Sequence, residues 1–305
     1  MSEKIKNTEN SEEKEKKIEP IPITARDVFS LIPYRQKTST KHDFGKLFAI
    51  CGSSFYRGAA YLSCAGALRS GVGICTLASI EKVVSAVASS LPECTFMPVD
   101  ESTNGTIYAY SFPNVNEISK RYTALLIGCG LSIDESTRVI VENTVKEAEC
   151  QLIIDADGLN ILSEKTELLH EAKLPPVITP HFYEMARLCN ASVKTIEKEP
   201  EKIALDFASE HNCIVVLKSH KTYVASPDGR ICVNLDKGNQ GLAKGGSGDV
   251  LAGIISSLCA QKMDPYDAAK CGVWLHGAAA DKCAERLSLQ GMLPSDILAD
   301  LASLF

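Results

Sequence analysis

The chain has 305 residues, of which 45% are hydrophobic and 6% aromatic, and its formal net charge at pH 7 is −6. That length and apolar content suit one large α/β domain with a substantial core. The acidic balance and the few aromatic residues argue against a nucleic-acid surface, and no apolar run approaches the roughly 20 residues that cross a bilayer. We therefore expect a cytoplasmic protein without nucleic-acid or membrane partners.

The N-terminal segment is rich in Lys, Glu, Ser and Asn, and it lacks the apolar core of a signal peptide. Such a composition buries too little apolar surface to offset the entropy that is lost on ordering. We expect a disordered or frayed charged tail over residues 1–22 and a single domain over residues 23–305. A short helix over residues 24–31, with Thr24 as its N-cap, begins that domain.

Apolar runs of strand length alternate with helical patterns along the rest of the chain. Continuous apolar runs are typical of buried parallel strands, and the helices between them indicate right-handed crossovers. The expected strands cover residues 46–51, 74–78, 123–127, 151–154, 177–179 and 214–217. The expected helices cover residues 59–70, 80–90, 134–149, 182–188, 195–211, 250–260, 266–287 and a last segment from residue 295.

Two further strands, at residues 222–225 and 231–234, flank Asp228-Gly229, which is a strong hairpin signal. The sequence therefore predicts a three-layer α/β sandwich. Its central sheet is mostly parallel, helices cover both faces, and an antiparallel hairpin lies at one edge.

Cysteine and histidine spacing gives no sign of a metal site. Twelve cysteines and six histidines occur, but neither Cys-x-x-Cys nor His-x-x-x-His is present. Most of the cysteines lie inside apolar runs, which favours buried free thiols in a reducing compartment over disulfides or zinc.

A glycine-rich stretch over residues 238–255 runs through Asp249 into an apolar helical segment. Glycines let the backbone approach a ligand closely, and the N-terminus of the following helix attracts an anion such as phosphate. Asp249 is then either a simple partner of the helix dipole or the base of a phosphoryl-transfer enzyme. The stretch is neither a Walker A loop nor a Gly-x-Gly-x-x-Gly fingerprint.

The residues that follow the expected strands form a second signal, because ligands of open α/β sheets bind beyond the carboxyl ends of the strands. These residues are rich in glycine and polar side chains, which suits a phosphorylated, hydroxylated ligand and leaves carboxylates for Mg²⁺. They include Gly52, Ser53, Ala59, Gly128, Gly130, Asp155, Asp157, Asn160, His181, Glu184, Lys218, Thr222, Gly248 and Asp249.

Each of these side chains also has a purely structural explanation. Asp157 would cap a helix that begins at Gly158, and His181 would be an ordinary loop histidine. Glu184 would be a first-turn partner of a helix dipole, and Lys218 would be a solvated surface lysine. Their joint occurrence at strand ends is what favours a ligand site.

Several short motifs occur in a characteristic order. They are Gly52-Ser53, residues 56–60, residues 67–73, Ile127-Gly128-Cys129-Gly130, residues 155–160, Thr179-Pro180-His181 with Glu184, Val216-Leu217-Lys218 with Thr222, Gly238-Asn239, residues 243–253 and Leu275-His276-Gly277-Ala278. In this order they resemble the ADP-dependent NAD(P)H-hydrate dehydratases, a carbohydrate-kinase-like family of the ribokinase superfamily. The resemblance extends over residues 25–303.

This resemblance implies a reaction. The family phosphorylates the ring hydroxyl of hydrated NADH or NADPH with ADP, or with ATP in eukaryotic relatives, and loss of phosphate restores the dinucleotide. It implies Asp249 as the base, and the amides of Gly246 and Gly248 as the cradle of the transferring phosphoryl group. It implies Mg²⁺ on the phosphates, with Glu184 bound to the ion through water. Relatives also suggest a homo-oligomer, specifically a tetramer.

The resemblance carries binding roles to individual positions. It implies that Ala59, Gly130, His181 and Asp249 contact the hydrated dinucleotide, and that Asp157 and Asn160 line the cleft. The adenine nucleotide would contact a second group of residues: Lys218, Ser219, His220, Lys221, Thr222 and Gly248.

Three positions depart from the family pattern. Ser219 replaces a glycine beside the nucleotide, Cys129 replaces a proline between two glycines, and Phe182-Tyr183 replaces Pro-Gly on the substrate side. The serine adds a side chain next to the nucleotide, and the two aromatic residues narrow the substrate side.

Two other functions remain open at this point. One is a small-molecule kinase of the same superfamily that acts on a vitamin precursor or a sugar. The other is a nucleotide-binding regulatory protein without turnover, which would need the glycine cradle but not Asp249. The sequence leaves open whether ADP or ATP, and whether NADH hydrate or NADPH hydrate, is preferred.

Overall fold

The computed structural model describes residues 19–305, which fold around one mixed sheet. The strands are β1 Ile21–Pro22, β2 Lys46–Ile50, β3 Ile74–Ile80, β4 Thr95–Val99, β5 Ala124–Ile127, β6 Gln151–Ile154, β7 Val177–Ile178, β8 Ile214–Leu217, β9 Thr222–Ala225 and β10 Ile231–Asn234. Their order across the sheet is β1-β10-β9-β8-β7-β6-β5-β2-β3-β4.

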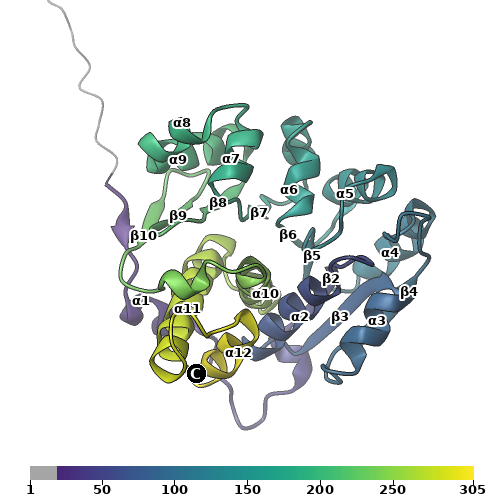
Figure 1. The fold of residues 1–305 in the computed structure, drawn as a ribbon, viewed down its shortest axis with the longest axis horizontal. Helices are drawn as coiled ribbons and strands as arrows, with labels where there is room; N and C mark the ends of the chain where they lie inside the picture. Colours follow the sequence, from purple (N-terminus) through teal and green to yellow (C-terminus); the bar gives the residue numbers. More distant parts are fainter. Residues whose placement is uncertain (1–18) are drawn as a thin grey trace, which may run out of the picture.

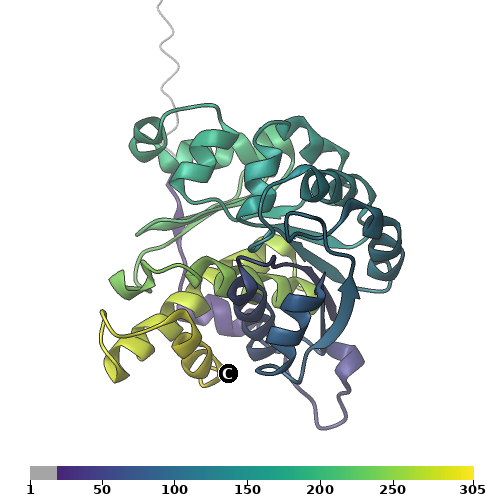
Figure 2. The same ribbon diagram turned by 45° about the vertical axis from the view of Figure 1, so that its right-hand side comes forward.

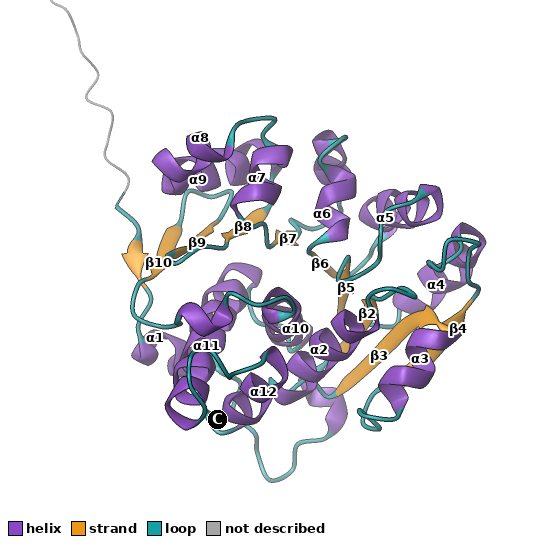
Figure 3. Cartoon of the chain, viewed as in Figure 1, coloured by secondary structure: helices purple, strands orange, loops and turns teal. Residues whose placement is uncertain are grey.

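Helices cover both faces of this sheet (Figure 1, Figure 3). One layer holds α1 Ala25–Leu31, α2 Arg57–Arg69, α3 Glu81–Ala88, α10 Ser247–Ala260, α11 Pro265–Arg286 and α12 Pro294–Ala302. The other holds α4 Phe112–Ser119, α5 Glu135–Glu147, α6 Asp157–Leu162, α7 Phe182–Leu188, α8 Val193–Lys198 and α9 Pro200–His211. In the turned view, the teal helices and the yellow C-terminal helices again lie on opposite sides of the sheet (Figure 2). The predicted three-layer sandwich is confirmed.

The strand order contains a switch point that positions the site. The parallel strand β2 pairs with β3 on one side and with β5 on the other. The chain therefore runs outward from β2 to β4, returns to β5, and continues the opposite way through β6, β7 and β8. Crevices at such reversals, beyond the carboxyl ends of the strands, are where open α/β sheets bind ligands.

The predicted hairpin is present, but it does not form the edge. Strands β9 and β10 pair antiparallel, and β1 adds a parallel strand outside β10. Ile21–Pro22 lies within the predicted tail but belongs to the sheet. Ile23 anchors this strand, because its side chain is buried and its N–H donates to Val233 at 2.9 Å. The expectation of disorder for residues 1–18 lies outside the described residues.

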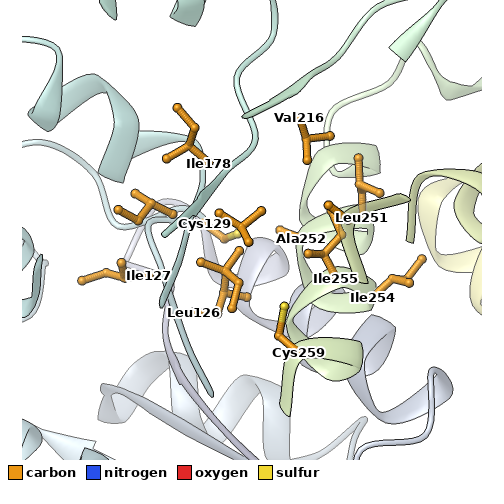
Figure 4. Close-up of a cluster of buried hydrophobic side chains, with 14 of the residues drawn as sticks. Leu126, Ile127, Cys129, Ile178, Val216, Leu251, Ala252, Ile254, Ile255 and Cys259 are labelled. Atoms are coloured by element: carbon orange, nitrogen blue, oxygen red, sulfur yellow. The ribbon is translucent and has the colours of Figure 1, made fainter. Parts of the chain in front are cut away.

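Helix α10 is the centre of the core. Figure 4 shows Leu251, Ala252 and Ile255 of this helix facing residues of the central strands, among them Leu126 and Val216. The helix is buried along nearly its whole length because α2 and α11 cover it on the side away from the sheet. The first turn of α10 therefore has a fixed position relative to the carboxyl ends of β5, β6 and β8.

Some elements differ from the sequence-based prediction. Strand β4 and helix α4 are not among the predicted elements, and residues 195–211 belong to two helices that meet at Glu199–Pro200. The helix that Asp157 would cap is present as α6, but it begins at Asp157 itself, and no described side chain caps it. All twelve cysteines are free thiols and most are buried, as expected. Within residues 19–305, no helix has both the length and the apolar character needed to cross a bilayer.

Candidate active site

The glycine-rich loop ends in a left-handed turn that starts α10. Gly246 is the N-cap residue at φ 101°, and a Cβ built there would lie 2.5 Å from a side-chain carbon of Leu62. Both the backbone angle and the close approach therefore require glycine. The next residues, including Gly248 and Asp249, occupy the first helical turn, where N–H groups have no carbonyl partner within the helix. This turn can hold an anion.

Asp249 lies in the wall of a cavity of about 830 Å³. Burial raises the pKa of its carboxyl to about 7, and the neighbouring charge of Asp155 adds to the effect. A hydrogen bond from Cys129 and the charge of Lys218 oppose the rise. A carboxyl group with a pKa near neutrality can both accept and release a proton at physiological pH, as a general base must.

Lys218 lines the cavity and forms an ion pair with Asp155, which lines it as well. The lysine Nζ lies 2.8 Å from Asp155 Oδ1, and the exposed fractions of the two side chains are 19% and 2%. Thr179 donates a second hydrogen bond of 2.6 Å to the same oxygen. Burial alone would lower the pKa of Lys218, but the charges of Asp155 and Glu184 outweigh it and raise that pKa. The lysine therefore remains a fixed cation.

The Lys218 ammonium also lies beside the first turn of α10. A Cβ built on Gly248 would be 3.4 Å from Lys218 Nζ. The cation and the free helical N–H groups therefore face one small volume, which favours a phosphate group there.

His181 and Glu184 form a capping box at the start of α7. The His181 N–H donates to Glu184 Oε2 at 2.8 Å, and the Glu184 N–H donates to His181 Nδ1 at 3.1 Å. Burial, followed by the charge of Lys218, lowers the pKa of His181, so the imidazole is neutral at pH 7. Burial raises the pKa of Glu184 to about 7. The dipole-partner explanation of Glu184 is therefore correct, yet its carboxylate also lies 4.0 Å from Lys218 Nζ and lines the cavity.

Three carboxylates and three lysines, Lys218, Lys237 and Lys244, line the cavity. Asp155, Glu184 and Asp249 line it, Asp157 lies close enough to raise the pKa of Asp249, and Lys218 is the ammonium that lies among them. Burial raises the pKa of Asp157 as well. Carboxylate oxygens are the donors that Mg²⁺ prefers, so this set of residues fits that ion.

A second group of predicted residues lies beside the cavity, around the ends of β5 and β6. Gly130 packs tightly on Ala59: a Cβ on this glycine would lie 2.7 Å from the Ala59 Cβ. Asp157 accepts a hydrogen bond of 2.8 Å from the Ser132 N–H, and Asn160 accepts one of 2.7 Å from Arg187 on α7. Asp157 and Asn160 therefore also have structural roles in these loops.

The cavity brings together most of the predicted residues. Its wall contains His181, Glu184, Lys218, Ser219, His220, Thr222, Gly246, Gly248 and Asp249. Ala59, Gly130, Asp157, Asn160 and Lys221 are outside that wall. Asp155, which the sequence places among the strand-end candidates without a specific role, is also in the wall. The wall further contains residues to which the sequence gives no individual role, among them Asn234, Lys237, Lys244 and His276. The position of Asp155 at a strand end and the motif around His276 were the available signals.

Comparison with known proteins gives this site its context. The family model described as NAD(P)H-hydrate dehydratase matches residues 47–302. The chain belongs to this family. The match spans β2 to α12 and therefore includes every residue of the site.

Curated dehydratases support the assignment. The ADP-dependent (S)-NAD(P)H-hydrate dehydratase of Bacillus subtilis is 33% identical over 278 residues, which cover 90% of this chain and 95% of that protein. The bifunctional NAD(P)H-hydrate repair enzyme of Thermofilum pendens is 35% identical over 86% of this chain. The chain spans about half the length of the bifunctional relatives.

Solved structures agree with the fold. The ADP/ATP-dependent NAD(P)H-hydrate dehydratase of Bacillus subtilis, co-crystallized with ATP and Mg²⁺, superposes with a TM-score of 0.78 at 30% identity and covers 94% of this chain and 98% of its own. A hydroxyethylthiazole kinase from Pyrococcus horikoshii, at 14% identity and a TM-score of 0.58, shares the fold alone.

The departures from the dehydratase pattern have local structural explanations. The Ser219 hydroxyl donates to the Lys221 carbonyl and accepts from the Lys221 N–H, so it fastens the turn after β8. The Cys129 thiol donates to Asp155 at 3.7 Å. Tyr183 is 65% exposed and its ring packs edge-on against His181, with centroids 6.0 Å apart.

Proposed function

We propose that this chain restores hydrated NADH or NADPH to the intact dinucleotide in a nucleotide-dependent dehydration, with ADP or ATP as phosphoryl donor and Mg²⁺ as cofactor. The observation that carries the proposal is Asp249. Its half-buried carboxyl has a pKa of about 7 and lies in the first turn of α10, directly after the glycine loop. Membership of the dehydratase family supports the choice of substrate.

In this proposal Asp249 takes the proton of the ring hydroxyl as that oxygen attacks the terminal phosphorus of the nucleotide. With ADP, the bond to the bridging oxygen breaks and AMP leaves. Phosphate then departs with the former hydroxyl oxygen while the adjacent ring carbon loses a proton, which restores the ring double bond. The net change is the loss of water from the hydrate and the hydrolysis of one phosphoanhydride bond.

The first turn of α10 and Lys218 supply electrostatic stabilisation. The N–H groups around Gly246 and Gly248 would hold the transferring phosphoryl oxygens, and the Lys218 ammonium beside Gly248 would neutralise developing charge. The turn over Lys218, Ser219, His220, Lys221 and Thr222 would hold the rest of the nucleotide. His181, Ala59, Gly130, Asp157 and Asn160 would contact the dinucleotide.

Asp155, Glu184 and Asp249 offer the hard oxygen donors that suit Mg²⁺, with Glu184 acting through water. The bound ion would neutralise the nucleotide phosphates. We also propose a cytoplasmic homotetramer, on the family resemblance alone. A solution mass near four times the 32.9 kDa of the chain would support it.

The decisive experiment is absorbance at 340 nm, at which the dihydronicotinamide absorbs and its hydrate does not. Purified protein is mixed with NADH or NADPH hydrate, Mg²⁺, and ADP or ATP in parallel. A rise that depends on nucleotide, with one AMP and one phosphate formed per dinucleotide when ADP is used, supports the proposal and identifies the donor. A flat trace from folded protein that still binds both nucleotides would overturn it and favour a kinase for another hydroxylated metabolite.

A further inference from the structure

Three cysteines, which we call the thiol cluster, lie together at the β3–β4 edge of the sheet. Cys64 lies on α2, Cys75 lies on β3, and Cys94 directly precedes β4. Their Sγ atoms all lie within 4.8 Å of one another. The three residues are far apart in the sequence, so the cluster is formed by the fold. None of them lines the cavity or has a role in the chemistry proposed above.

The pairing of β3 with β4 and the packing of α2 bring the thiols together. The two strands are parallel with Thr76 opposite Thr95, so Cys75 and Cys94 occupy neighbouring positions one residue earlier. The Cys94 thiol points toward β3, because it donates to the Cys75 carbonyl at 3.4 Å. Helix α2 packs on β3 and brings Cys64 to this pair. Three different elements therefore present one sulfur each to a shared volume.

The spacing of the sulfurs suits one metal ion. A metal–thiolate bond is about 2.3 Å long, so three sulfurs around one ion lie about 4 Å apart. Sulfurs that already lie within 4.8 Å of one another need side-chain shifts of less than about 1 Å to reach that arrangement. Cys64 and Cys75 are fully buried and Cys94 is 4% exposed, so water competes little for an ion held there.

The donor set of the thiol cluster favours a soft ion. No histidine or carboxylate within residues 19–305 joins the cluster. Thiolates select soft ions such as copper(I) and zinc, whereas magnesium and calcium require oxygen donors. Structural zinc is almost always bound by four ligands, and the cluster supplies three. Copper(I) is stable with two or three sulfur ligands, so it fits the cluster without a fourth donor.

An ion can reach the thiol cluster from the surface. Pro92 and Glu93, just before Cys94, and Thr95, just after it, are exposed. They belong to the short connection between α3 and β4 and to the start of β4, which is the edge strand of the sheet. Local opening of this connection would uncover the Cys94 thiol without disturbing the central strands.

We infer that Cys64, Cys75 and Cys94 form a copper(I)-binding site that joins α2, β3 and the start of β4. On binding, the ion forms bonds to the sulfurs and displaces thiol protons, which leave to solvent, and no electron is transferred. The inference is independent of the reaction proposed for the cavity, because the two sites share no residue. A bound ion would fasten the edge strand to the helix layer that contains α2.

The test is a competition for copper(I) between the reduced full-length chain and the chromophoric chelator bathocuproine disulfonate, in the absence of oxygen. The wild-type chain is compared with Cys94→Ala and Cys64→Ala. Both substitutions keep a small apolar side chain, and alanine also suits a helix at position 64. We expect each to weaken copper(I) binding by at least about 100-fold, because losing a ligand costs more than losing an outer-shell partner, which costs about 10- to 100-fold.

Cys150→Ala is the matched control, because Cys150 is more exposed than the clustered cysteines and lies outside the cluster. It should keep the wild-type affinity. Circular dichroism melts without metal establish that each variant folds, and one equivalent of copper(I) should raise the melting temperature of wild-type and Cys150→Ala protein only. Wild-type copper(I) affinity in both cluster variants, or no competition by the wild-type chain, would overturn the inference. An equal or larger rise with zinc that Cys94→Ala abolishes would overturn the choice of copper(I).

Discussion

The raised pKa of Asp249 lowers the stability of the folded chain at neutral and alkaline pH. Its pKa of about 7 in the folded chain is well above the value of about 3.9 for an unperturbed Asp. The folded state therefore prefers the protonated form. The contribution of Asp249 to the free energy of unfolding is most favourable below the pKa of Asp in the unfolded chain. It is lost as the pH rises through the folded-state pKa of about 7.

An Asp249→Asn variant should consequently be more heat-stable than the wild-type chain in the absence of ligands. Asparagine keeps the shape but carries no charge, so we expect a melting temperature about 2–5 °C higher at pH 8. The gain should be less than half as large at pH 5, at which the folded wild-type carboxyl is protonated. Differential scanning calorimetry at both pH values checks this, with the exposed Asp236→Asn as control. A lower melting temperature of Asp249→Asn at pH 8 would show that the ionised carboxylate is stabilised.

The Lys218–Asp155 pair is the most deeply buried ion pair in the cavity wall. Lys218→Met leaves the Asp155 carboxylate buried without its cation, and we expect the free energy of unfolding to fall by about 3–5 kcal/mol in urea titrations. Lys221→Met, in the same turn but exposed, should change it by less than about 0.5 kcal/mol.

The double variant Lys218→Met/Asp155→Asn distinguishes lost pairing from lost packing. Removing the unpaired charge should recover at least half of the stability, while ADP affinity stays low because the cation beside Gly248 is absent. A single variant that loses less than about 1 kcal/mol would show that water already solvates Asp155.

At the scale of elements, α10 and α2 determine where the site lies. Their backbones approach so closely that a Cβ on Gly253 would lie 2.1 Å from the Ser63 carbonyl oxygen. A larger residue would push α10 away from α2, and its first turn, with Asp249, would move with it.

Gly253→Ala should therefore destabilise the chain, by about 2 kcal/mol or more in urea titrations, although alanine is the better helix former. Gly58→Ala in α2 is the matched control, because a Cβ there meets nothing within 4 Å. It should leave stability unchanged or raise it by up to about 1 kcal/mol. Equal effects of the two substitutions would argue against the close packing.

The elements that could be predicted from the sequence are those whose local pattern and burial agree. Strands such as β5 and β8 are continuous apolar runs, and all four residues of each are buried. β4 was missed because it is a partly exposed edge strand that contains Pro98 and lacks such a run. α6 is only six residues long, so the sequence indicates it only as a helix beginning near Gly158 that Asp157 would cap.

On the scale of the whole molecule, the sheet extends to the N-terminal side of the predicted domain boundary. β1 adds to β10, and buried Ile23 follows it. A chain that starts at residue 24 should therefore melt several degrees lower than one that starts at residue 19. Circular dichroism melts of the two truncations test the boundary. Equal melting temperatures of the two truncated chains would place the N-terminal domain boundary after β1.

The sequence identifies those site residues that directly follow a strand or a glycine-rich loop. It does not identify residues that reach the site only through packing between distant elements. Lys218 follows directly from its place at a strand end, and Asp249 follows from the glycine-rich stretch that runs into a helix. Asp155 and Asp157 lie two residues apart, and the sequence could not tell which one faces the cavity. The structure resolves this, because Ala156 between them adopts φ 50° and Asp157 turns to the Ser132 N–H. The places of Asn234 and His276 in the cavity wall are visible only once β10 and α11 are placed together.

The central claim is that Asp249 is the base of a nucleotide-dependent dehydration. Its most direct test is the initial rate of absorbance increase at 340 nm for wild-type and Asp249→Asn protein with the hydrate, ADP and Mg²⁺. ADP binding is confirmed for both proteins by calorimetry. The account predicts a rate that is about 10²- to 10⁴-fold lower in the variant, with ADP affinity nearly unchanged. A variant rate within a few-fold of the wild-type rate would contradict the account and remove Asp249 from the mechanism.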